Sequence, residues 1–132
     1  MSYYSIRFAV QTNVDMIVDS LTTSGSLDPV NGMYWSWQSG YINFKIEGKS
    51  PSCTTRKNKF QFHIGGYLKP FASTRSVALD ISTTKDNVLI IDLDIATLFN
   101  FIELSSLSQV MIPGKEAIEI ADILPALFSL NE

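Results

Sequence analysis

The chain has 132 residues, of which 45% are hydrophobic and 17% are charged, and its formal net charge is −3. A chain of this length fits one domain, and its apolar content is high enough to build a core, which argues against disorder. The basic residues are scattered and do not form the stripe that neutralises phosphates, so we expect no nucleic-acid binding.

The N-terminal quarter predicts a strand, a short helix and a loop. Apolar and other residues alternate from Tyr4 to Val10, the period of a half-buried strand. Asn13–Ser20 predicts a short helix with Asn13 as its N-cap, and Thr22–Gly32 is rich in turn-forming residues. The first residues do not resemble a signal peptide, and no apolar run is long enough to cross a membrane as a helix.

Both tryptophans lie in one stretch, "GMYWSWQSGYINFKIEG", which runs from Gly32 to Gly48. Trp35 and Trp37 are two residues apart, so both point to one side if the backbone is extended. Large aromatic side chains most often fill cores, and a core role is the more ordinary interpretation. A ligand-binding platform and a redox-active site are the alternatives.

Four further segments have the composition and alternation of strands. They are Ile42–Ile46, Phe60–Ile64, Val77–Ile81 and Val88–Ile95. Together with the N-terminal strand they predict at least five strands.

The last third of the chain predicts the only substantial helix. Ala117, Ile120, Ala121 and Leu124 have helical spacing, and Pro125 must end or kink that helix. The expected fold is therefore mainly β, with sandwich-like antiparallel sheets and one or two short C-terminal helices.

No enzyme motif is present: there is no nucleophile elbow, no P-loop and no dinucleotide fingerprint. Asp92 and Asp94 point to one face of a predicted strand, where solvated edge charges are more common than a catalytic acid pair. We therefore expect a protein that is not an enzyme.

His63 is the only histidine and is expected to lie opposite the apolar face of its strand. Taken alone, such a histidine is more often structural than a metal ligand, because a metal needs several ligands. Cys53, the only cysteine, rules out an internal disulfide. Cys53, Met33 and Met111 are soft donors that suit Cu(I), but none has a ligand spacing to His63.

Two segments carry a resemblance to a known family: "LDPVNGMYWSWQSGYINFKIEG" from Leu27 to Gly48 and "FQFHIGGY" from Phe60 to Tyr67. They resemble the MbnP-like family, whose members occur beside methanobactin-type copper operons and more widely in bacteria. The resemblance extends from about Ile6 to the closing "EAIEIADILPALFSL". It implies a secreted, β-rich, copper-binding protein, periplasmic or at the cell surface. It also implies that a tryptophan is oxidised to kynurenine by a partner di-haem, peroxidase-like enzyme.

Transferred to this chain, the resemblance makes His63 the metal ligand for copper and Trp35 or Trp37 the oxidation site. The chain departs from the family pattern because one histidine cannot form a site of paired imidazoles. We also expect residues 1–132 to be a single MbnP-like domain that lacks the family's N-terminal strands and signal peptide. The alternative function is a metal-free surface or interaction β-module in which the tryptophan segment is core.

Overall fold

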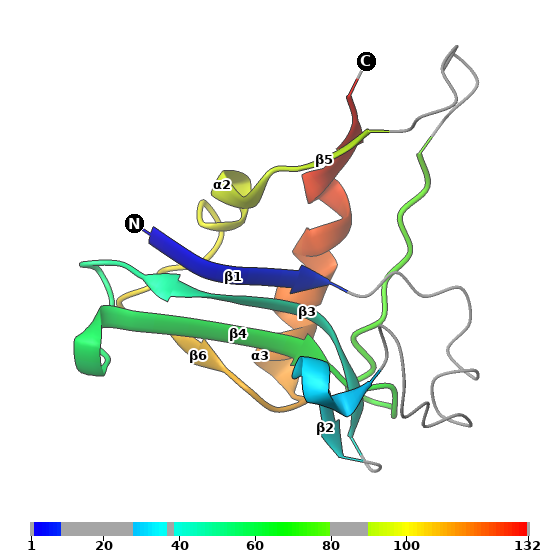
Figure 1. The fold of residues 1–132 in the computed structure, drawn as a ribbon, viewed down its shortest axis with the longest axis horizontal. Helices are drawn as coiled ribbons and strands as arrows, with labels where there is room; N and C mark the ends of the chain where they lie inside the picture. The colour runs from blue at the N-terminus through cyan, green and yellow to red at the C-terminus, as the bar shows by residue number, and fades with distance from the viewer. Residues whose placement is uncertain (1, 9–27, 37–38, 80–89, 132) are drawn as a thin grey trace.

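The computed structural model describes residues 2–8, 28–36, 39–79 and 90–131. Within these ranges the strands and helices follow in chain order in Figure 1. The strands are β1 (Ser2–Phe8), β2 (Tyr34–Ser36), β3 (Gly40–Lys49), β4 (Lys59–Gly65), β5 (Ile91–Leu93), β6 (Gln109–Val110) and β7 (Phe128–Leu130). The helices are α2 (Ile95–Leu98) and α3 (Lys115–Ile123), with 3-10 turns η2 (Pro29–Asn31), η3 (Arg56–Asn58) and η4 (Leu124–Leu127).

A five-stranded sheet forms the body of the protein. Its order is β1-β3-β4-β6, and β2 pairs with β3. All these pairs are antiparallel except β4–β6, which is parallel. A separate antiparallel pair, β5 and β7, brings the C-terminal end of the chain against residues 91–93.

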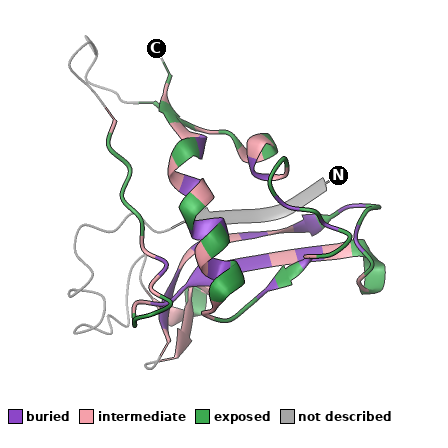
Figure 2. Ribbon diagram, turned by 180° about the vertical axis from the view of Figure 1, so that it is seen from behind, coloured by how far each residue is buried: buried purple, intermediate pink, exposed green. Residues whose placement is uncertain are grey.

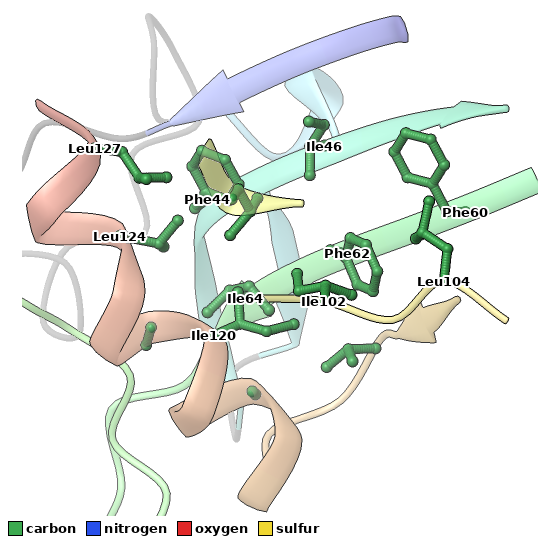
Figure 3. Packing of buried hydrophobic residues seen from close by; sticks show 14 of the residues in the cluster. Phe44, Ile46, Phe60, Phe62, Ile64, Ile102, Leu104, Ile120, Leu124 and Leu127 are labelled. Atoms are coloured by element: carbon green, nitrogen blue, oxygen red, sulfur yellow. The ribbon is translucent and has the colours of Figure 1, made fainter. Parts of the chain in front are cut away.

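Helix α3 crosses one face of the main sheet, and the core lies between them (Figure 2). Apolar side chains of β3 and β4 point toward α3 and η4 in Figure 3 because alternate residues of a strand share a face. The sheet contributes Phe44, Ile46, Phe60, Phe62 and Ile64, and the C-terminal segment contributes Ala117, Ile120, Ala121, Leu124 and Leu127. The prediction of a mainly β fold with a short C-terminal helix is confirmed.

The predicted helical face is buried as expected, since Ala117, Ile120, Ala121 and Leu124 all belong to the core. The α-helix ends at Ile123, and Pro125 lies in the first turn of η4, where its missing N–H costs least. The proline prediction is therefore confirmed. Within the described residues, no helix is long and apolar enough to cross a membrane.

Two strand predictions are wrong in part. Residues 77–79 form no strand, and Val77 is 41% exposed, because no neighbouring strand pairs with this segment. Of the predicted strand Val88–Ile95, the described residues form only β5, because Asp94 caps α2 and Ile95 is already helical; Val88 and Leu89 lie outside the described residues. Ile81 and the predicted helix Asn13–Ser20 lie outside the described residues.

A bulge interrupts β3 close to its start. Ile42 is opposite Gly65 and Phe44 is opposite Ile64, so β3 has one extra residue there. Ile42 is buried but is not part of the main core cluster. The bulge matters for the site because it lies beside the end of β4.

Candidate metal centre

The face of β4 that points away from the core carries Gln61, His63 and Gly65 at alternate positions. His63 lies opposite Lys45 in the neighbouring strand, and Gln61 lies opposite Glu47. The side chain of His63 therefore lies on the predicted face. The residue is nevertheless buried, at 7% exposure.

Glu47 binds the imidazole of His63 and determines which ring nitrogen is available. The distance from His63 Nε2 to Glu47 Oε1 is 2.7 Å, and Gln61 Nε2 donates to the same oxygen at 3.1 Å. A carboxylate only accepts, so Nε2 carries the proton and Nδ1 carries the lone pair of the neutral ring. Among the described residues, the hydrogen bond of this imidazole is the one made by Nε2.

Glu47 is held in its charged form. Partial burial pushes its pKa upward, but hydrogen bonds from His63 and Gln61 and the nearby charge of Lys45 outweigh this effect. The pKa of Glu47 is therefore lower than its usual value of 4.5. Lys45 Nζ lies 4.0 Å from Glu47 Oε1, so a positive charge is also close to the pair.

The polar network continues beyond this pair on both sides. Lys45 Nζ donates to the carbonyl oxygen of Gly32 at 3.4 Å, and Gln109 Nε2 donates to Gln61 Oε1 at 3.2 Å. The network thus links Gly32, the residue after η2, to β3, β4 and β6, and it holds Glu47 and His63 in fixed positions.

Trp35 lies on the same face of the sheet as His63. Its Cζ3 is 3.1 Å from the position that a Cβ on Gly65 would take. Gly65 follows His63 by two residues in β4, a separation of about 6.6 Å along a strand. Trp35 as a whole is half-buried. Trp37 lies outside the described residues.

A second aromatic ring covers a second glycine nearby. A Cβ on Gly40 would lie 2.8 Å from the ring of Tyr67, and Gly40 has a φ of +73°, which favours glycine. Tyr34 and Tyr41 pack edge to face with their ring centres 5.0 Å apart. The hairpin β2–β3 and the end of β4 are therefore joined by two contacts of a glycine with an aromatic ring.

Cys53 cannot bind the same ion as His63. It is 3% exposed and belongs to the core cluster, on the other face of the sheet. Within the residues described, no three or more His, Cys, Asp or Glu side chains gather as they do around a metal ion. An imidazole is a ligand type that copper accepts, but one imidazole and one carboxylate are fewer than the four ligands of a structural zinc site.

The two aspartates of the predicted strand do not form an acid pair. Asp94 lies after the end of β5 and caps α2, accepting from Thr97 N at 3.1 Å and from Thr97 Oγ1 at 2.6 Å. These hydrogen bonds lower the pKa of Asp94 below 3.8. Its carboxylate is used to start a helix.

The fold and the site define a small β-sheet protein with one histidine held by a carboxylate on the outer face of its sheet. The family model MbnP matches residues 1–112. The chain belongs to the MbnP family, as the two segments around the tryptophans and His63 indicated. The match includes β1 to β6 and ends before α3, so the closing segment lies outside it. No curated protein and no solved structure matches the chain.

Proposed function

We propose that this chain is an exported, copper-associated binding protein of the MbnP type and not an enzyme. The observation that supports it best is the 2.7 Å contact between His63 Nε2 and Glu47 Oε1. Metal-binding histidines usually donate their other ring N–H to a carboxylate, which fixes the ring and makes the free nitrogen more basic. Export is proposed from the family alone.

The residues of the chain have separate tasks in this proposal. His63 offers Nδ1 as a ligand, Glu47 orients the ring, and Lys45 balances the charge of Glu47. Trp35 covers the backbone at Gly65, two residues after His63. Bound copper would supply one-electron redox chemistry at this face.

Titration with Cu(I) against a coloured chelator, without oxygen, tests the proposal. The wild-type chain should compete weakly for one ion, and His63→Ala should not compete. Glu119→Gln is the control, because Glu119 pairs with Lys115 on α3, which packs on the other face of the sheet. Tight binding that persists in His63→Ala would show that another residue is the ligand.

Oxidation of a tryptophan by a di-haem, peroxidase-like partner is the second part of the proposal. Trp35 is the candidate that the structure describes: it is half-buried and packs against Gly65, two residues after His63 in β4. Fragmentation mass spectrometry of protein from the native host should find added oxygen on Trp35. If neither Trp35 nor Trp37 is modified, this part is wrong while the copper site can still stand.

A metal-free interaction module is the second candidate function. The observation that favours it is the ammonium of Lys45, 4.0 Å from the Glu47 oxygen that binds His63, because positive charge opposes a cation. In that case His63 only ties β3 to β4. The same titration separates the two functions, since the module predicts no copper uptake and a loss of stability in His63→Ala.

A further inference from the structure

Continued by one residue, the register of the parallel pair β4–β6 would bring Met111 beside His63. In this pair Gln61 is opposite Gln109 and Phe62 is opposite Val110. Met111 is one step beyond the last paired residues, since β6 ends at Val110. The pairing thus connects β4 with a segment that is far away in the sequence.

A contact further along the chain supports this placement. A Cβ on Gly66 would lie 3.0 Å from the Pro113 side chain, so the two segments stay side by side beyond His63. His63 and Met111 are thus bracketed by the strand pairing on one side and by this contact on the other.

The side chain of Met111 is not part of the core. Gln109 hydrogen-bonds Gln61 on the outer face of the sheet, whereas Val110 belongs to the core cluster. Met111 is the next residue and is 41% exposed, so it lies outside the core, as does Ile112 at 73%. A thioether and an imidazole therefore lie on adjacent segments.

We infer that Met111 Sδ is the second protein ligand of a Cu(I) site whose first ligand is His63 Nδ1. The inference rests on the proposed copper function and adds a ligand and a preference for one oxidation state. Thioether sulfur is a soft, neutral donor that selects Cu(I), whereas zinc prefers four nitrogen, oxygen or thiolate ligands. A monovalent ion is also repelled only half as strongly by Lys45 as a divalent ion is.

Anaerobic titration of the full chain with Cu(I), Cu(II) and Zn(II) tests the inference through three variants. They are His63→Ala, Met111→Leu and Met33→Leu, the last a matched control that removes another thioether. Met111→Leu should weaken Cu(I) binding by about tenfold or more, since even outer residues of metal sites change affinity by about 10–100-fold. Met33→Leu should bind as the wild type does, and Cu(II) and Zn(II) should bind more weakly than Cu(I).

A direct readout comes from the methionine methyl signals in NMR spectra of wild-type protein titrated with Ag(I), a redox-inert substitute for Cu(I). The methyl signal of Met111, assigned from Met111→Leu, should shift with one equivalent. Loss of Cu(I) binding in His63→Ala but not in Met111→Leu, or a shift of Met33 instead, would overturn the inference and leave the proposed function intact. No Cu(I) uptake by the wild type would overturn both.

Discussion

Replacing Gly65 by alanine tests how closely β3 approaches the end of β4. The new Cβ would lie 2.5 Å from the carbonyl oxygen of Tyr41 and 2.9 Å from Cα of Ile42, both backbone atoms. The strands must separate to relieve these contacts, so we expect a loss of about 2–3 kcal/mol, in the upper part of the range for overpacking. For a chain of this size the melting temperature should fall by roughly 6–12 °C.

Gly114→Ala is the matched control, because its nearest neighbour would be Glu116 Oε2 at 3.9 Å and its backbone is extended. It should stay within about 1 kcal/mol of the wild type. Urea unfolding followed by circular dichroism measures both variants. Equal stability of the two would refute the close approach of β3 to β4. The double variant Gly65→Ala/Trp35→Ala should recover little stability, since the backbone contacts remain, whereas full recovery would assign the clash to the ring alone.

Three further predictions concern the core, the carboxylate beside His63 and a helix cap. Phe62→Ala should cost about 3–5 kcal/mol in urea unfolding because Phe62 is fully buried, whereas Phe101→Ala, at a residue 65% exposed, should change stability by less than about 0.5 kcal/mol. Glu47→Gln should weaken Cu(I) binding by about 10–100-fold in chelator competition. Glu119→Gln, on the exposed side of α3, should not weaken it. Equal Cu(I) affinities of Glu47→Gln and the wild type would show that Glu47 is not part of the site. Hydrogen bonds from Thr97 lower the pKa of Asp94 below 3.8, so its contribution to stability is present above that pH and is lost as pH falls through the folded pKa. The stability of Asp94→Asn, measured from about pH 5 to pH 2, should therefore fall less steeply than that of the wild type.

The parts of the fold that the sequence predicts well are those in which one face is buried. Alternation in β3 and β4 identified Phe44, Ile46 and the apolar face of β4, and helical spacing identified the buried face of α3. Burial makes the periodicity strict, because a shift of one residue would expose the whole face. Val77–Ile81 shows the converse: a short alternation predicts a strand, but whether a partner strand lies beside it is a tertiary property.

The site could be predicted only in part for a similar reason. The face of His63 follows from alternation, but its contact with Glu47 needs the β3–β4 register. The sequence marks Met111 as a soft donor without a ligand spacing to His63, and the inferred proximity of the two residues rests on the register of the parallel β4–β6 pair. The neighbouring Gln61–Gln109 bond spans 48 residues in the sequence. No local sequence motif predicts a contact between residues so far apart in the sequence.

Each of the two glycine–aromatic contacts joins the β2–β3 hairpin to the end of β4. The hairpin supplies the ring in one contact and the glycine in the other. The ring of Trp35 in β2 packs against Gly65 in β4, and the ring of Tyr67, after β4, packs against Gly40 in β3. Opening either segment must therefore uncover both glycines at once, so the two should open as one cooperative unit. The amide hydrogens of Ile42, bound to Met33 O, and of Gly66, bound to Tyr41 O, would then exchange with deuterium through the same opening event.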